Sequence, residues 1–187
     1  MDRKAQILQT LAQMLEHPRG ERITTAALAA QVHVSEAALY RHFASKAQMF
    51  DALIDFIETT VFRQIDEIGA AAPHSGTAQA GQAVAALLSF AEHNRGLTRL
   101  LSGDALVVED DRLQDRMNQF TDRLEAALRQ MLQQALAHGE LPATDDPAAR
   151  ASLILNFVLG RWQRYAKSGW RHAPTEHLDQ QMTILLH

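Results

Sequence analysis

Cysteine is absent from the 187 residues of the chain. Its absence excludes disulfide bridges, thiolate zinc sites, iron–sulfur clusters and cysteine nucleophiles. Long apolar runs are absent too, because the uncharged stretch 68–91 contains Pro73, three glycines and several polar residues. Neither this stretch nor the N-terminus, which lacks an apolar signal core, is expected to enter a membrane. We therefore expect a cytoplasmic protein.

The sequence also lacks the short motifs of common active sites. It has no glycine-rich dinucleotide or P-loop motif, no nucleophile elbow and no HExxH zinc motif. Of its nine histidines, only His172 and His177 are near neighbours, and a spacing of five residues puts them on different faces of a helix. We expect neither an enzyme nor a bound metal or cofactor.

The composition is that of a folded globular protein, with 47 % apolar and 21 % charged residues. The length fits one domain or two small ones. Charge is distributed unevenly: residues 1–50 hold six basic and four acidic side chains, whereas residues 51–187 hold twelve and eighteen. A mildly basic first quarter on an acidic body favours the approach of that end to a polyanion.

Apolar residues recur at helical spacing along the whole chain, and no segment alternates as a strand would. Asp146 and Pro147, for example, form an N-cap followed by proline at the first helical position. We therefore predict an all-α fold, with residues 69–81 as a joint. The expected helices cover residues 7–15, 25–31, 36–43, 46–68, 82–92, 96–101, 107–138, 147–165 and 175–186.

Residues 23–46 have the spacing of a helix-turn-helix motif. This motif needs a small residue where its helices cross, a tight turn four residues later and an apolar residue about six further on. Ala29, His33 and Leu39 occupy those three places. The same spacing also fits a plain helical hairpin, so these positions alone leave DNA binding open.

If Leu39 faces the core, Ala37 and Arg41, two residues away on either side, point outward, towards a DNA major groove. Ser35 and Glu36 then reach base edges near the start of the second helix, with Glu36 accepting a hydrogen bond from a cytosine amino group. Phosphate contacts suit Tyr40 and His42, the hydroxyls and amides of Thr24 and Thr25, and the ammonium of Lys46. The predicted DNA-binding residues are Thr24, Thr25, Ser35, Glu36, Ala37, Tyr40, Arg41, His42 and Lys46.

A resemblance to a known family is carried by residues 39–43, Leu-Tyr-Arg-His-Phe, followed by Ser45 and Lys46. They resemble the signature of TetR-family DNA-binding domains, and residues 23–35 fit the same pattern. The resemblance implies a three-helix helix-turn-helix domain at 1–46 and a helical dimerisation and partner-binding domain at 47–187. His33 replaces the usual turn glycine, and histidine adopts positive φ more readily than most residues.

Within this family the chain is most similar to the nucleoid occlusion factors, in residues 22–25, 34–38, 49–51, 96–101 and 111–114. That similarity implies a nucleoid-associated protein that binds specific DNA sites and inhibits ring assembly by the division protein FtsZ. In that branch the groove between the long linking helix, here expected at 46–68, and the following helix takes the FtsZ C-terminal tail, and Phe56 and Asn94 match its residues by position. The chain departs from the pattern at Gln64, Ser89 and His93.

Two alternatives stay open at this point. Phe56 has the spacing of a core residue and Asn94 that of a cap at a helix break, so neither needs to form a groove. The whole protein also fits a ligand-responsive repressor, in which a small apolar molecule binds among the helices of the second domain. A large cavity there favours the repressor, whereas a closed and well-packed domain favours the first function.

A homodimer is expected from the helix at 151–162, which is apolar on nearly every side. Such a helix buries one face in its own domain and a second against a partner. The last two helices are therefore predicted to form a two-fold interface, with Val158 facing the partner. Trp162, Tyr165 and Trp170 are interpreted as core or dimer contacts rather than as the lining of a ligand pocket.

Overall fold

The computed structural model describes residues 2–17, 23–103, 105–106 and 110–186, and the regular elements within those ranges are all helices. The all-α prediction is therefore confirmed. No helix in these ranges is long and apolar enough to cross a membrane. The helices are α1 (Arg3–Leu15), α2 (Thr25–Gln31), α3 (Glu36–Tyr40), α4 (Lys46–Ala71), α5 (Gly76–His93), α6 (Arg95–Leu101), α7 (Asp111–Ala137), α8 (Pro147–Lys167) and α9 (Leu178–Leu186).

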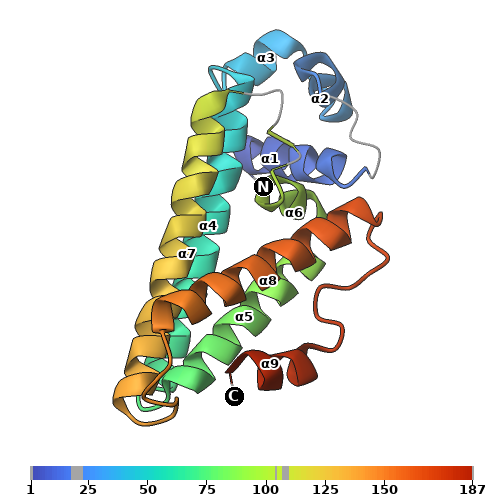
Figure 1. The fold of residues 1–187 in the computed structure, drawn as a ribbon. Helices are drawn as coiled ribbons and strands as arrows, with labels where there is room; N and C mark the ends of the chain where they lie inside the picture. The colour runs from blue at the N-terminus through green and yellow to red at the C-terminus, as the bar shows by residue number, and fades with distance from the viewer. Residues whose placement is uncertain (1, 18–22, 104, 107–109, 187) are drawn as a thin grey trace.

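Helices α2 and α3 lie at one end of the molecule, with α1 crossing beneath them (Figure 1). Ala29 is 2 % exposed and Leu39 is fully buried, as expected for the helix crossing and for the anchor of α3. His33 has a φ of 58°, the left-handed conformation that the tight turn requires. The three positions chosen from sequence spacing therefore have the expected local structure.

Helices α4 and α7 run side by side in the same direction along the length of the molecule (Figure 1). Near their starts, the Arg116 guanidinium pairs with Asp51, and with Glu58 at 2.8 Å. Near their ends, Gln134 Nε2 donates to the backbone oxygen of Pro73 at 2.5 Å. One continuous helix, α4, thus connects the α1–α3 end to the body.

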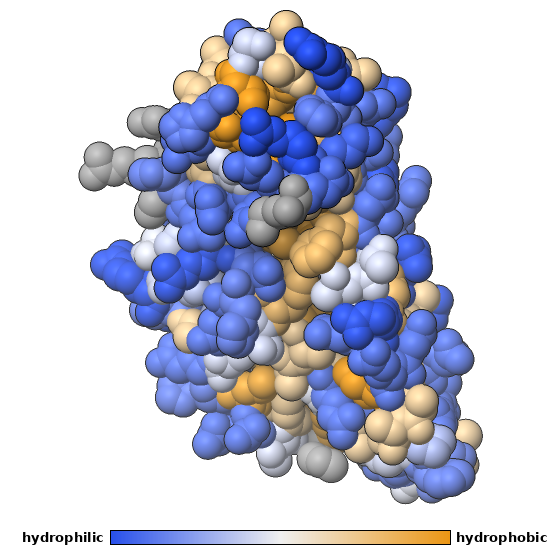
Figure 2. Space-filling model, turned by 180° about the vertical axis from the view of Figure 1, so that it is seen from behind, coloured by the Kyte–Doolittle hydropathy of each residue, from blue (hydrophilic) through white to orange (hydrophobic). Residues whose placement is uncertain are grey.

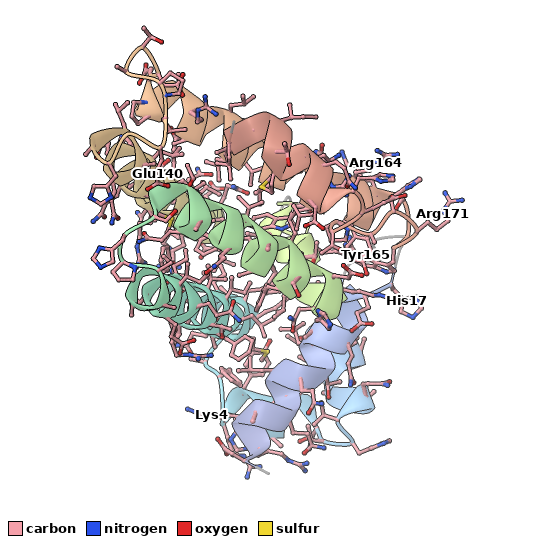
Figure 3. All side chains as sticks on the ribbon, turned by 90° about the horizontal axis from the view of Figure 1, so that it is seen from below. Lys4, His17, Glu140, Arg164, Tyr165 and Arg171 are labelled. Carbon is pink, nitrogen blue, oxygen red and sulfur yellow. The ribbon has the colours of Figure 1, made fainter. Side chains whose placement is uncertain are left out.

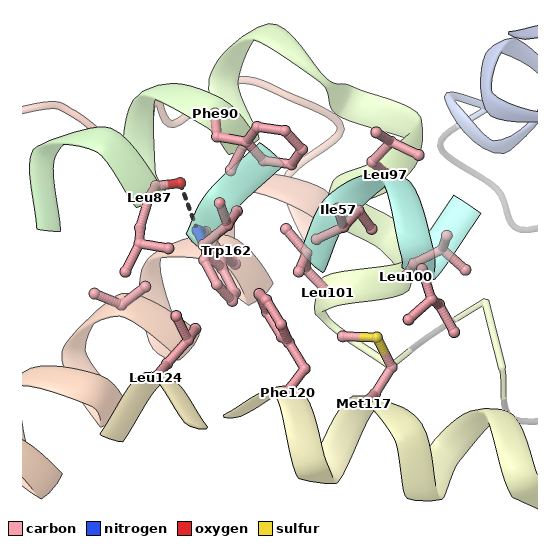
Figure 4. Close-up of a cluster of buried hydrophobic side chains, with 14 of the residues drawn as sticks. Ile57, Leu87, Phe90, Leu97, Leu100, Leu101, Met117, Phe120, Leu124 and Trp162 are labelled. Atoms are coloured by element: carbon pink, nitrogen blue, oxygen red, sulfur yellow. Dashed lines mark hydrogen bonds between the residues drawn. The ribbon is translucent and has the colours of Figure 1, made fainter. Parts of the chain in front are cut away.

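The body core is formed where α5, α6 and α8 meet α4 and α7. Trp162 is fully buried there, and its Nε1 donates to the backbone oxygen of Leu87 at 3.2 Å (Figure 4). Phe120 from α7 and Leu100 from α6, both fully buried, fill the same cluster. The interpretation of Trp162 as a core residue is confirmed.

The joint expected at residues 69–81 is wrong in extent. Helix α4 continues to Ala71 and α5 begins at Gly76, so the break is four residues long. Glycine at 76 serves close packing rather than flexibility: a Cβ there would lie 2.1 Å from the backbone oxygen of Met131. Helix α5 begins at this residue because Ser75 caps it, accepting a hydrogen bond from Ala78 N at 3.2 Å.

The partner-facing position assigned to Val158 is also wrong, because Val158 is fully buried within its own chain. Helix α8 buries the face that carries Ile154, Val158 and Trp162. The adjacent face, about 100° around the helix, carries Leu153, which is 58 % exposed, and the partly exposed Phe157. Sequence hydropathy alone did not separate these faces, since both are apolar.

The C-terminal end of α1 is held by the body of the molecule. Trp170 Nε1 donates to the backbone oxygen of Glu16 at 2.8 Å, and Arg99 donates to that of His17 at 3.0 Å. Figure 3 shows His17 on the same side of the molecule as Tyr165 and Arg171. Trp170 therefore joins two parts of the fold instead of lying in the core.

Candidate DNA-binding surface and helical groove

The candidate DNA-binding surface is built on two capped helices. The Thr24 hydroxyl oxygen accepts from Ala27 N at 3.1 Å and begins α2, while the Ser35 oxygen accepts from Ala38 N at 3.2 Å and begins α3. These caps satisfy backbone amides that the first helical turn leaves unpaired. The hydroxyl protons of both residues remain outside these two bonds, so each can still donate to an acceptor on DNA.

The structure leaves most of the predicted DNA-binding side chains on the outside of α2, α3 and the start of α4. Leu39 and Phe43 are buried beneath them, as the spacing predicted. The outward direction expected for Ala37 and Arg41 is confirmed by their exposure. The exposed residues of the set are Thr24, Ser35, Glu36, Ala37, Tyr40 and Arg41, and the partly exposed ones are Thr25, His42 and Lys46.

Three of these side chains form a hydrogen-bonded relay that sequence reasoning missed. Thr25 Oγ1 donates to Glu36 Oε2 at 2.7 Å, and the Tyr40 hydroxyl donates to Thr25 Oγ1 at 3.4 Å. The relay connects the first turn of α2 with both ends of α3. Thr25 and Glu36 are eleven positions apart and on different helices, so no local pattern signals their contact.

Cationic side chains flank this surface. Ser45 caps α4, accepting from Gln48 N at 3.2 Å, and this cap places Lys46 at the first position of the helix. The Lys46 ammonium lies 5.5 Å from the Phe50 ring centre, within reach of a cation–π contact. Lys4, labelled in Figure 3, lies similarly over Phe43 at 5.7 Å. Lys4 was not among the predicted DNA-binding residues, although it too carries a charge to this end of the molecule.

A groove of about 440 Å³ lies between α1, α4 and the junction of α5 with α6. Phe56 and Asn94, which the sequence paired as groove residues, both line it, together with Leu8 and Ala12 of α1. Phe56 is 52 % exposed, so its interpretation as a core residue is wrong. Figure 2 shows an apolar strip running down the middle of this side of the molecule, between hydrophilic margins.

Asn94 lies at the break between α5 and α6 and also lines the groove. Its Nδ2 donates to the backbone oxygen of Phe90 at 2.7 Å, which satisfies a carbonyl in the last turn of α5. That bond leaves the side-chain oxygen as an acceptor for a bound chain. The helix-break and groove interpretations of Asn94 are therefore compatible.

Of the three departing positions, His93 lines the groove beside Asn94. Its Nδ1 lies 2.8 Å from the backbone oxygen of Ser89, so this ring nitrogen donates and the other faces away from that bond. Gln64 lies two helical turns beyond Phe56 on α4, and neither it nor Ser89 lines the groove. The part of the groove around Phe56 and Asn94 is thus separate from two of the three departures.

A second hollow, of about 420 Å³, opens between α6, α7 and α8. Its rim carries the amides of Gln114, Asn118 and Asn156, and its floor includes Leu100 and Met117. The groove beside α1 is the more apolar of the two. An extended chain with an apolar side chain fits that groove better than it fits the amide-rich hollow.

Two family models match the chain. Residues 19–53 match the bacterial regulatory proteins of the tetR family, and residues 79–187 match a tetracyclin repressor-like C-terminal domain of SlmA-like type. The two matches therefore fall on the candidate DNA-binding surface and on the body.

Curated relatives are similar over nearly the whole chain. The nucleoid occlusion factor SlmA of Colwellia psychrerythraea is 43 % identical over 99 % of this chain and 93 % of its own length. That of Escherichia coli is 47 % identical over 98 % and 93 %. The factor from Idiomarina loihiensis is 41 % identical over 98 % of this chain and 93 % of its own length.

Solved structures of lower identity share the fold. The MbdR regulator from Azoarcus has a TM-score of 0.81 at 18 % identity, covering 98 % of this chain and 96 % of its own. AibR, solved with isovaleryl coenzyme A and operator DNA, has a TM-score of 0.78 at 18 % identity, covering 99 % and 98 %. At these identities the similarity establishes the architecture alone.

Proposed function

The chain belongs to the TetR family of bacterial regulatory proteins, in the branch of the SlmA nucleoid occlusion factors, and we propose that it binds specific DNA sites and there inhibits FtsZ assembly. The observation that carries this proposal is the pairing of Phe56 and Asn94 in one apolar groove beside the helix-turn-helix end. A protein that holds DNA at one surface and a peptide at an adjacent one brings the two together. We infer association with the nucleoid from the same arrangement.

DNA recognition is assigned to the surface at the start of α3. Ser35, Glu36 and Ala37 are exposed there and reach base edges in the major groove, where each base pair presents a distinct set of donors and acceptors. Arg41, one helical turn further on, faces the same groove. Thr24, Tyr40, His42 and Lys46 contact the phosphate backbone, which fixes the register of α3 on the duplex. Thr25 belongs to this surface as well.

Residues 1–46 form the DNA-binding domain of the proposal, and residues 47–187 form the dimerisation and partner-binding domain. The homodimer uses the face of α8 that carries Leu153 and Phe157, because Leu153 is 58 % exposed and Phe157 partly exposed within one chain. A two-fold axis there presents two copies of α3 to successive major grooves, as paired half-sites require.

The groove takes the C-terminal tail of FtsZ in an extended conformation. Phe56 offers an apolar surface of which half is exposed, and the Asn94 side-chain oxygen accepts from a peptide N–H. Most side chains that line the groove are apolar or uncharged, and Glu16 is the acidic residue among those described there. The contact is therefore chiefly one of shape and apolar burial, with a small number of polar bonds for direction.

The proposal is tested with the purified full chain in two binding assays. A DNA site is first selected from a randomised duplex library, and a labelled FtsZ C-terminal peptide is then titrated with the protein bound to that site. Phe56→Ala is expected to weaken peptide binding at least tenfold and to leave DNA affinity unchanged. Ile184→Ala, which truncates the 78 % exposed side chain on α9, is the matched control and is expected to change neither.

Two outcomes contradict the proposal. A wild-type protein that selects no DNA sequence lacks the first activity. A wild-type protein that selects a site but never binds the tail is a regulator of another kind, and release of DNA by a small apolar molecule then identifies the ligand-responsive repressor.

A further inference from the structure

The hydroxyl of Thr25 has a single proton, and the structure shows where that proton goes. Thr25 Oγ1 donates to Glu36 Oε2 at 2.7 Å, a usual length for a hydrogen bond between oxygens. Phosphate oxygens only accept hydrogen bonds, so the Thr25 hydroxyl cannot bind a phosphate while it donates to Glu36. The Tyr40 hydroxyl, in contrast, remains able to bind a phosphate. Its hydrogen bond to Thr25 Oγ1 is 3.4 Å long, so exchanging that bond for one to a phosphate costs little.

Glu36 gains a fixed orientation from this bond. Its side chain is exposed at the first position of α3, where it would otherwise sample several rotamers. Thr25 Oγ1 holds Oε2 and leaves Oε1 to accept from a base. Immobilising a long polar side chain before binding removes an entropic cost that binding would otherwise include.

We propose that Thr25 is a positioning residue for base recognition: its hydroxyl holds the Glu36 carboxylate so that Oε1 meets the amino group of a cytosine in the major groove. The inference rests on the proposed function and deepens it, because it assigns Thr25 to sequence preference and leaves phosphate contact to Tyr40. It also names the base that the carboxylate selects: the major-groove donors are the amino groups of cytosine and adenine, and adenine presents its amino group beside the N7 acceptor, which repels a carboxylate.

The test measures affinity for the DNA site selected by the wild type and for single-base variants of that site. Thr25→Val keeps the shape of the side chain and removes its hydroxyl, and Thr25→Ser restores a hydroxyl. Thr25→Val is expected to reduce discrimination at one cytosine position about tenfold, while affinity for unrelated DNA stays within twofold of the wild type. Thr25→Ser is expected to regain most of the discrimination.

The double variant with Glu36→Ala isolates the contact between the two residues. Once the carboxylate is gone, Thr25→Val is expected to have no further effect on discrimination. An equal loss on every DNA sequence, or a loss that persists beside Glu36→Ala, overturns the inference and makes Thr25 a phosphate contact or a fold residue. A selected site whose preference does not change with Glu36→Ala also overturns it, although the proposed function survives. Only a wild-type protein that selects no DNA site would contradict both this inference and the proposed function.

Discussion

Gly96, in the first turn of α6, lies so close to Ala12 of α1 that a Cβ added to it would be 1.9 Å from the Ala12 backbone oxygen. No side chain fits at that distance, so α6 must shift away from α1 before any residue larger than glycine is accommodated. Gly96→Ala is therefore expected to lower the free energy of unfolding by at least about 2 kcal/mol, measured by chemical denaturation.

Gly69 provides the matched control for this substitution. It also lies within a helix, near the end of α4, but nothing lies within 4 Å of a Cβ built on it. Gly69→Ala is expected to raise the free energy of unfolding by about 0.5–1 kcal/mol, because alanine loses less backbone entropy than glycine in a helix. Equal effects of the two substitutions would show that α1 and α6 are not in tight contact.

The carboxylate of Glu140 makes stability depend on acid pH. Burial alone raises its pKa, but hydrogen bonds from the Thr77 and Ser75 hydroxyls and from the amides of Thr77 and Gly76 outweigh this effect and lower the pKa to about 2. Because the folded-state pKa lies below the unfolded value near 4.5, the stabilisation is complete above about pH 5 and is lost as the pH falls towards 2.

Glu140→Gln tests this dependence because it removes the charge and keeps the shape. At pH 7 the variant is expected to be less stable than the wild type by about 1–2 kcal/mol. The difference should shrink as the pH falls from 5 to 2, when the wild type protonates. Denaturation curves that keep a constant difference across this range would contradict the assignment.

Two substitutions on α8 separate assembly from folding. Leu153→Asp places a charge on the 58 % exposed apolar face and is expected to give folded monomers. Val158→Asp places the same charge at a fully buried position and is expected to unfold the chain, because an unpaired buried carboxylate is strongly destabilising. Sedimentation velocity and circular dichroism distinguish the two results. A dimeric Leu153→Asp variant would move the interface to another face.

Changing Lys46 or Glu36 to alanine is expected to alter DNA binding in two different ways. Lys46→Ala should weaken binding to all DNA sequences alike and make the dependence of log K on log salt shallower by about one unit. Glu36→Ala should relax preference at one base pair by about 1–3 kcal/mol and leave the salt slope unchanged. Titrations at several salt concentrations measure both quantities, and an equal loss of preference in both variants would argue against the assigned roles.

Asn94 is expected to contribute to both the groove and the fold. Asn94→Ala should abolish binding of the FtsZ tail and lower the free energy of unfolding by about 1 kcal/mol, since the Nδ2 bond to the Phe90 backbone oxygen is lost. Asn94→Asp, which keeps the accepting oxygen, should retain part of the tail binding. A variant that loses stability and DNA affinity together would assign Asn94 to the scaffold alone.

Local patterns in the sequence were sufficient for the order of the helices and for several of their starts, but not for all of their bounds. Caps at Ser35, Ser45 and Asp146 lie where short-range hydrogen bonding favours them, and each begins the helix that was expected there. The outward direction of Ala37 and Arg41 follows from helical geometry once Leu39 is buried. These features depend on residues a few positions apart, so a single sequence contains all the information that they need.

Tertiary packing decided the rest, because it depends on which residues distant in sequence come together. Phe56 and Val158 both lie in helices at apolar spacing, yet one is half exposed in a groove and the other is fully buried. Gly76 is a helix breaker by propensity but lies within α5, since only glycine fits against the Met131 backbone. The bond from Thr25 to Glu36 likewise exists only because the turn at His33 brings α2 against α3. The periodicity of the sequence shows that a helix face is apolar, but which helix packs against that face depends on the whole fold.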